Sequence, residues 1–106
     1  LIKDISMADS LAQVMTSKTS GESSAVQWFG GTGQMIVTGT FDTSTVSLQV
    51  SPDDGVTWIT VSGSSITAAD CKNFDLNSCD IRLAITSAGA STSINAWLTK
   101  TTGQWS

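Results

Sequence analysis

The chain has 106 residues, a length that suits one domain. Its formal net charge is -4, and it has only five Lys and Arg residues. This charge excludes a nucleic-acid interface, which needs clustered Lys and Arg. No apolar run approaches the roughly 20 residues of a membrane helix. The charged fraction is 13%, against about 25% in ordinary soluble domains. Ser and Thr fill much of the difference, so we expect a polar but weakly charged surface.

The first 20 residues give the weakest structural signal. Leu11, Val14 and Met15 fit a helical spacing, whereas residues 12–16 also fit a short strand, and residues 16–24 are typical of a loop. Residues 1–20 are therefore predicted to be either an arm that reaches a neighbouring molecule or an edge segment. An arm would offer these apolar anchors to an interface: Leu1, Ile2, Ile5, Leu11 and Met15.

Residues 21–106 are predicted to form a β domain, because apolar and polar residues alternate from Ser24 onward. Gly39 interrupts one alternating segment, as a bulge or a close-packing point would. Gly30-Gly31-Thr32-Gly33 is expected to be a hairpin connection, since no helix or Lys follows it as in a phosphate loop. The two clearest strands predict this set of core residues: Val46, Leu48, Val50, Ile81, Leu83 and Ile85.

Turn signals recur about every 8–12 residues, which is typical of an antiparallel sandwich. The sequence therefore predicts an all-β fold. We expect a single antiparallel β-sandwich or jelly roll of about seven to eight strands, with an N-terminal arm.

Residues 51–58 match the Asp-box pattern Ser-x-Asp-x-Gly-x-x-Trp at its four fixed positions: Ser51, Asp53, Gly55 and Trp58. Pro52 fixes φ at the entrance to the turn, the aspartates can accept hydrogen bonds from backbone N–H groups ahead of them, and Gly55 allows a positive φ. The pattern predicts a hairpin whose turn is covered by the Trp58 ring. A single copy argues against a propeller, whose sequence would repeat.

Catalysis has little support in the sequence. There is no His, so the commonest general base and every Ser–His or Cys–His pair are missing. Asp53 and Asp54 are adjacent in a turn, unlike the separated carboxylates of a glycosidase. The loop acids suit Ca²⁺ but lack EF-hand spacing. We expect no enzymatic activity, no metal site and no cofactor.

Two other sets of residues are candidates for special roles. Cys71 and Cys79 are too far apart in sequence for a Cys-x-x-Cys redox or zinc pair, and they could either form a disulfide or remain free thiols in a reducing cytoplasm. Trp97 is predicted on the strand face opposite Ile94, Ala96 and Leu98. With Trp105 in the tail, it is a candidate for contact with a partner protein or for stacking on a sugar.

Four segments together resemble small virion proteins of tailed bacteriophages. They are Val-Gln-Trp-Phe-Gly-Gly-Thr-Gly at 26–33, Val-Thr-Gly-Thr-Phe at 37–41, residues 46–58, and Ile-Arg-Leu at 81–83. The cysteine pair is not part of that pattern. The resemblance implies a sandwich or jelly-roll structural protein without catalytic residues.

For function, the resemblance implies first a capsid decoration (cement) protein. Such a protein would bind the major capsid protein on the outer capsid surface as a homo-oligomer, with a trimer favoured, after assembly in the host cytoplasm. It would have no nucleic-acid or membrane partner. The alternatives are a virion module that binds host glycans through Trp97 or Trp105, and a tail or connector component.

Overall fold

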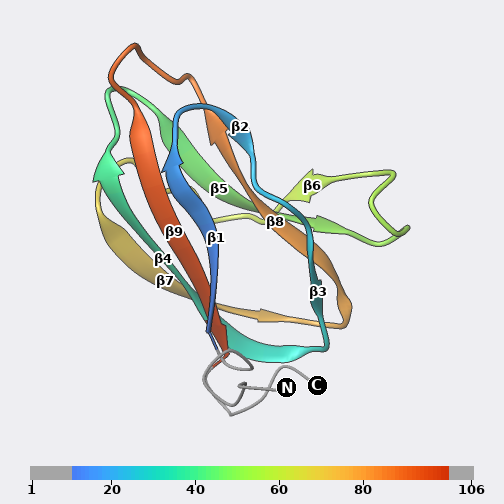
Figure 1. Ribbon diagram of the computed structural model, residues 1–106. Helices are drawn as coiled ribbons and strands as arrows, with labels where there is room; N and C mark the ends of the chain where they lie inside the picture. Colours follow the sequence, from blue (N-terminus) through green and yellow to red (C-terminus); the bar gives the residue numbers. More distant parts are fainter. Residues whose placement is uncertain (1–10, 101–106) are drawn as a thin grey trace, which may run out of the picture.

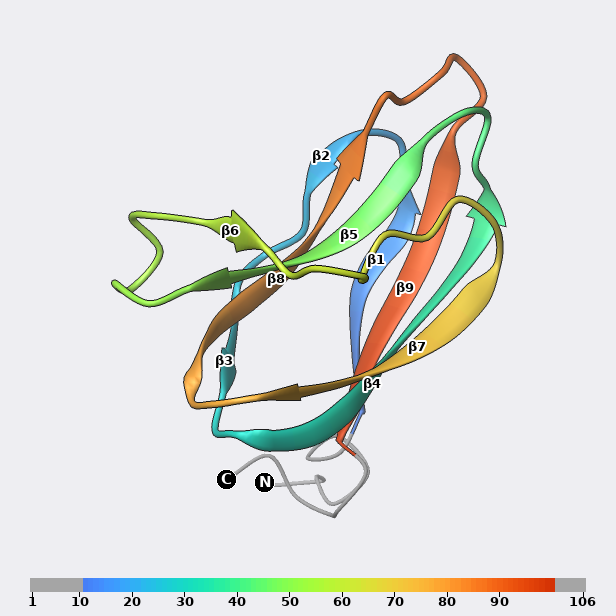
Figure 2. The ribbon, with the colours of Figure 1, turned by 180° about the vertical axis from the view of Figure 1, so that it is seen from behind.

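The structure is a computed structural model that describes residues 11–100, with backbone only for Leu11 and Ala12. Two antiparallel sheets face each other in this range (Figures 1 and 2), and the all-β prediction is confirmed. Within these residues there is no helix that could cross a membrane. The strands are β1 (Leu11–Lys18), β2 (Gly21–Glu22), β3 (Val26–Trp28), β4 (Gly31–Thr40), β5 (Thr45–Ser51), β6 (Ile59–Thr60), β7 (Asp70–Leu76), β8 (Cys79–Thr86) and β9 (Ser93–Lys100).

The strand order is that of a jelly roll. The four-stranded sheet runs β1-β9-β4-β7, and the five-stranded sheet runs β2-β8-β5-β6, with β3 also paired to β8. β2 and β3 pair with different parts of β8 and act as one interrupted strand. On that count there are eight strands, and every connection except the β5–β6 hairpin crosses from one sheet to the other.

The core fills the space between the two sheets. Leu48 and Leu83 lie opposite each other in the β5–β8 register, and both are fully buried. All of the predicted core residues are buried except Val50, which is half-buried because it pairs with Ile59 where the β5–β6 hairpin begins. The other buried apolar residues are Met15, Trp28, Met35, Val37, Ile66, Phe74, Ala84, Ile94, Ala96 and Leu98.

The segment before Ser20 is an edge strand where the structure describes it. β1 pairs with β9, and Met15 lies opposite Ala96. The expected loop over 16–24 is wrong in part, since β1 continues to Lys18 and β2 follows. The pairing register shifts on both sides of Met15, and such bulges break the alternation of a strand. That irregularity explains why the sequence of β1 also fitted a helix.

The connection between β3 and β4 is not the predicted hairpin. β3 pairs with β8 in the five-stranded sheet, whereas β4 pairs with β7 and β9 in the other sheet. Gly30 and Gly31 form this corner with φ values of 95° and 103°, which residues other than Gly rarely adopt. The glycines therefore allow the chain to change sheets rather than to turn back on itself.

Candidate functional site

The β5–β6 hairpin projects from one side of the sandwich (Figures 1 and 2). Asp53 organises its turn: one carboxylate oxygen accepts the Thr57 N–H at 2.7 Å and the Ser51 hydroxyl at 3.0 Å. The Ser51 oxygen accepts the Gly55 N–H at 2.8 Å. Asp54 and Gly55 both have positive φ, 64° and 90°. The predicted turn is therefore present, and Asp53 is the acid that holds it.

Asp53 is exposed, and its chemistry is that of a hydrogen-bond acceptor. Hydrogen bonds from the Thr57 side chain and backbone, with a smaller one from Ser51, lower the pKa of the Asp53 carboxyl, because they stabilise the charged form. A carboxylate committed to its own turn in this way is unsuited to proton transfer at neutral pH.

Trp58 fastens the hairpin to the sheet. It immediately precedes β6, and its indole N–H donates to the Gly55 carbonyl at 3.1 Å. On its other side the ring faces Arg82 of β8, whose guanidinium carbon is 4.2 Å from the ring centroid. Arg82 Nε also donates to Gln49 Oε1 at 2.8 Å. Trp58 is thus held by Arg82 on β8, which in turn bonds to Gln49 on β5, so two strands of the five-stranded sheet support the turn.

The braced hairpin presents two apolar side chains to solvent. Val56, in the turn, is 81% exposed, and Ile59, in β6, is 55% exposed. Together with Phe29 they are the large apolar residues that are exposed in the part of the chain the structure describes. Sequence reasoning did not single out either residue, because both fall outside the fixed positions of the turn pattern. The sequence feature that could have identified Val56 is its position as an apolar residue within an otherwise polar turn.

The outer face of the four-stranded sheet carries Trp97. Its neighbours across the sheet are Gln13 on β1 and Ile36 on β4, and Cys71 on β7 completes the row. The prediction that Trp97 faces away from Ile94, Ala96 and Leu98 is confirmed, since these three are buried and Trp97 is partly exposed. The neighbouring row is polar and uncharged: Thr99, Gln34 and Asn73. These two rows therefore carry one aromatic side chain, Trp97, and no charged residue.

The other predicted interface residues divide into two groups. Met15 is 2% exposed and belongs to the core, so its assignment as an interface anchor is wrong. Leu11 begins β1, and its side chain lies outside the description. Leu1, Ile2, Ile5 and Trp105 lie outside the described residues.

The two cysteines are free thiols, and the disulfide alternative is wrong. Cys71 lies in β7 of the four-stranded sheet and is exposed, whereas Cys79 lies in β8 of the other sheet and is half-buried. The residues between them carry the chain from one sheet to the other, which separates the thiols. Burial, with a smaller contribution from Asp80, raises the pKa of the Cys79 thiol.

The acids are dispersed over the surface. Among residues 11–100, no group of three or more His, Cys, Asp or Glu side chains lies close enough to hold a metal ion. Asp70 accepts the Cys71 N–H at 2.7 Å, and Asp42 accepts the Ser91 N–H at 2.7 Å. These acids, like Asp53, are engaged in hydrogen bonds with backbone amides.

Two comparisons with known proteins give no match. A scan against models of protein families gives no match, and a search of curated proteins gives none either. The site must therefore be interpreted from its own geometry.

Proposed function

We propose that this chain is a structural, non-enzymatic protein of a tailed-bacteriophage virion, and specifically a capsid decoration protein that binds the major capsid protein. The observation that carries the proposal is the braced hairpin with Val56 and Ile59 exposed on it. Water contact with large apolar side chains is unfavourable by roughly 1.5–3 kcal/mol each relative to burial. A protein partner that covers the hairpin recovers this free energy.

The bracing supports a docking role for the hairpin. A loop that orders only on binding loses conformational entropy at that moment, whereas a pre-ordered loop does not. Asp53, Trp58 and Arg82 already fix the hairpin in the free chain. Two further features agree with the proposal: the resemblance of four segments, 26–33, 37–41, 46–58 and 81–83, to small phage virion proteins, and the low charge of the chain.

In this role the protein would stabilise the shell through added buried contacts. Several copies, with a trimer favoured, would bridge neighbouring capsid subunits on the outer surface. A ligand that binds only the assembled state stabilises that state by mass action, by about 2.7 kcal/mol per site at a concentration of 100 Kd. No reacting group is required, which agrees with the engagement of Asp53 in its own turn.

The test is co-sedimentation of the recombinant protein with undecorated shells of its virus. Val56→Ser and Ile59→Ser, alone and combined, should weaken binding, with a loss of at least tenfold for the double variant. Thr60→Ser is the matched control, because Thr60 is exposed in the same hairpin and already polar. Circular dichroism should show that all variants fold. Binding by the double variant at wild-type affinity would refute a docking role for the hairpin.

A second candidate is a virion module that binds host glycans, and the Trp97 face favours it. A partly exposed Trp amid amide and hydroxyl side chains can stack on a sugar ring while its neighbours donate hydrogen bonds. A glycan array probed with the wild type and with Trp97→Ala separates the two candidates. A glycan signal lost in Trp97→Ala but kept in Val56→Ser would favour this second function.

The remaining rival is a tail or connector component. It would use the same hairpin for contact with a different virion protein. Labelled copies localised on intact particles by electron microscopy would place the protein on the capsid or on the tail.

A further inference from the structure

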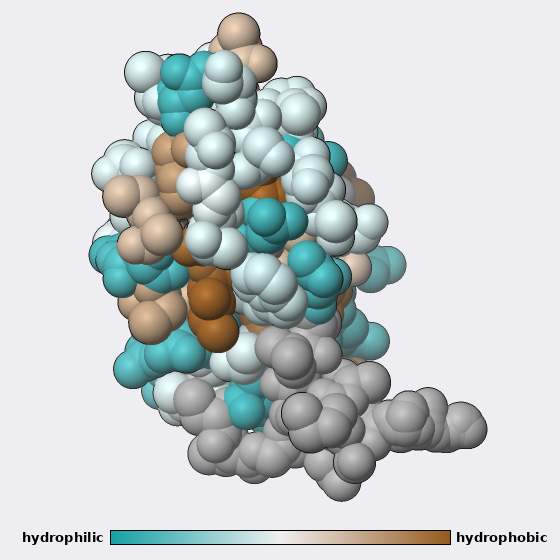
Figure 3. Space-filling model, turned by 60° about the vertical axis from the view of Figure 1, so that its left-hand side comes forward, coloured by the Kyte–Doolittle hydropathy of each residue, from teal (hydrophilic) through white to brown (hydrophobic). Residues whose placement is uncertain are grey.

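A slot opens between the two sheets on the side where β7 forms the edge. Its volume is about 220 Å³, and it lies between β7 and the residues that follow β6. Figure 3 looks onto the side of the molecule that lies at the left in Figure 1, and apolar surface is visible there between polar atoms. β6, the edge strand of the five-stranded sheet, has only two residues, and residues 61–64, which follow it, form part of the wall opposite β7.

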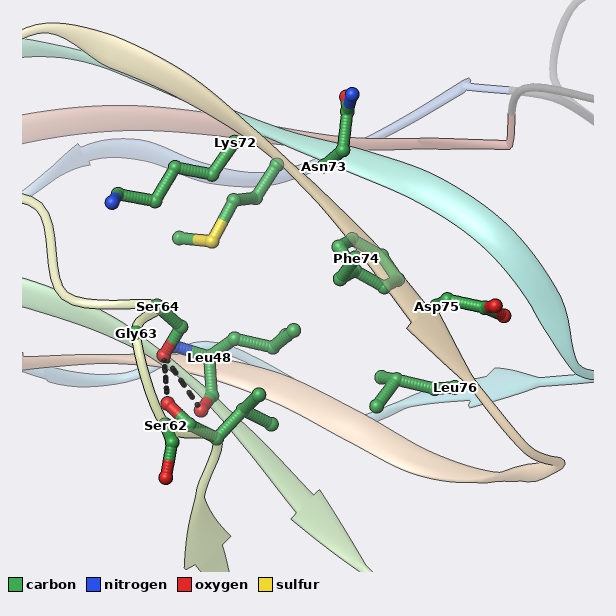
Figure 4. Close-up of a pocket in the computed structure, with 11 residues that line it drawn as sticks. Leu48, Ser62, Gly63, Ser64, Lys72, Asn73, Phe74, Asp75 and Leu76 are labelled. Carbon is green, nitrogen blue, oxygen red and sulfur yellow. Dashed lines mark hydrogen bonds between the residues drawn. The ribbon is translucent and has the colours of Figure 1, made fainter.

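The walls of the slot are partly apolar and partly polar. β7 contributes Phe74 and Leu76, and the opposite wall includes Leu48 and Val61, with Met35 also lining it. The polar group deepest in this wall, the Ser64 hydroxyl, is already bonded to the Val61 carbonyl at 2.7 Å and the Leu48 carbonyl at 3.4 Å (Figure 4). A cavity of about 150 Å³ is enough for one benzene, so this slot of about 220 Å³ has room for a short hydrocarbon chain along its apolar side chains.

One cation lines this slot. Lys72 alternates with Phe74 and Leu76 on the inner face of β7, opposite the buried Met35 in the register. In Figure 4 Asn73 and Asp75 point away from the slot. Asp70, on the same side of β7 as Lys72, accepts the Cys71 N–H. Among residues 11–100, Lys72 forms no ion pair and no hydrogen bond.

An inward-pointing Lys on an edge strand also discourages sheet-to-sheet aggregation. That role requires the charge alone, and it does not account for the slot beside it, with its apolar side chains. The two features together match one class of ligand: a hydrocarbon chain for the slot, with an anionic head for the amine, since opposite charges attract most strongly where water is partly excluded.

We infer that the slot between β7 and the segment 61–64 binds a small amphipathic anion, an alkyl carboxylate of roughly six to eight carbons, with its head group at Lys72. The inference is independent of the proposed function, because Val56, Ile59 and Trp97, which carry the two candidate functions, do not line the slot. A ligand here would hold β7 to the opposite sheet and so stabilise the folded chain.

The test is a titration with sodium octanoate, followed by NMR of the protein labelled with ¹³C in its methionine methyl groups. Met35 lines the slot, whereas Met15 lies in the core beside β9, so Met15 is an internal control. We expect a saturable shift of the Met35 signal, with the Met15 signal unchanged. Met35→Leu and Met15→Leu variants assign the two signals.

The head-group assignment is tested by a matched set of ligands and variants. Lys72→Met should weaken octanoate binding at least fivefold and leave octanol binding unchanged. Lys18→Met removes the same charge from β1 and should leave both unchanged. Equal affinity of the wild type for octanol and octanoate would overturn the assignment of an anion. An unshifted Met35 signal, or equal shifts of the Met35 and Met15 signals, would overturn the inference that the ligand binds in this slot.

Discussion

The guanidinium of Arg82 and the indole ring of Trp58 form a cation–π pair, with 4.2 Å between the guanidinium carbon and the ring centroid. The pair joins the turn before β6 to the outer surface of β8, two strands away in the same sheet. Gln49, which accepts a hydrogen bond from Arg82 at 2.8 Å, lies between them on β5. The projecting hairpin is thus supported from the sheet as well as from within its own turn.

Removal of this support should loosen the hairpin. Arg82→Ala is expected to lower the free energy of unfolding by about 0.5–1 kcal/mol, the usual size of an exposed cation–π pair, and to shift the indole N–H signal of Trp58 in NMR spectra. Arg82→Lys keeps the charge but cannot reproduce the planar contact, so an intermediate result is expected. Wild-type stability and an unmoved indole signal in Arg82→Ala would show that the turn holds itself.

The hairpin turn should respond to acid. The pKa of Asp53 is lowered in the folded chain, so its contribution is present above the unfolded value, about 3.9, and is lost as the pH falls through the folded pKa. We expect the Thr57 amide signal to move as Asp53 is protonated below about pH 4. In Asp53→Asn the signal should be insensitive to pH over that range. A titration of Thr57 that persists in Asp53→Asn would assign the effect to another group.

The Leu48–Leu83 pair should dominate the core in mutational tests. Both residues are fully buried and directly opposite in the register, and truncation of a buried Leu costs about 2–5 kcal/mol. Because the two side chains are neighbours, the loss of unfolding free energy in the double variant should differ from the sum of the losses in the two single variants. Urea unfolding of Leu48→Ala, Leu83→Ala and the double variant measures this. A loss below about 0.5 kcal/mol at both sites would contradict the core assignment.

Gly39 should be less replaceable than Gly63. Both have positive φ, 122° and 76°, but a Cβ on Gly39 would collide with the Ser93 carbonyl oxygen, whereas one on Gly63 meets nothing within 4 Å. Gly63→Ala is expected to cost about 1–2 kcal/mol, as for a left-handed residue, and Gly39→Ala to cost more. Thermal unfolding of the two variants gives the comparison. Equal costs would mean that β4 and β9 can separate without penalty.

The two thiols should differ in reactivity. Cys71 is exposed, while Cys79 is half-buried and its thiol pKa is raised, so less of Cys79 is in the reactive thiolate form. Alkylation near pH 8, followed by mass spectrometry, should modify Cys71 first. Cys71→Ser should leave a single slow reaction. Faster modification of Cys79 would show that the Cys79 thiol, at the first residue of β8, is accessible to the reagent.

The alternating segments were predictable because their pattern is regular. Val46, Leu48, Ile81 and Leu83 are buried as expected, and the turn chemistry of Ser51, Asp53 and Gly55 led directly to the hairpin. The pattern failed where tertiary pairing overrides it. β1 is irregular in register around Met15, and Gly30 makes a corner between sheets, a feature that looks like a hairpin connection in sequence alone.

The candidate sites were less predictable than the fold. The position of Trp97 follows from alternation, but its row with Gln13, Ile36 and Cys71 depends on strand order, which alternation does not specify. The exposure of Val56 and Ile59 depends on how far the hairpin projects from the sandwich. The slot beside Lys72 depends on how β7 and the segment 61–64 come together. Each is a property of how the sheets are assembled.

The pairing of β1 with β9 has a consequence for the synthesis of the chain. β1, the first described strand, pairs only with β9, the last one. The four-stranded sheet therefore cannot be completed until the segment through Lys100 has left the ribosome. Folds dominated by such distant pairings form in about milliseconds to seconds, slowly compared with helical bundles. We therefore expect nascent chains that end before β9 to keep Met15 and Met35 accessible, and this domain to reach its native state only after β9 has left the ribosome.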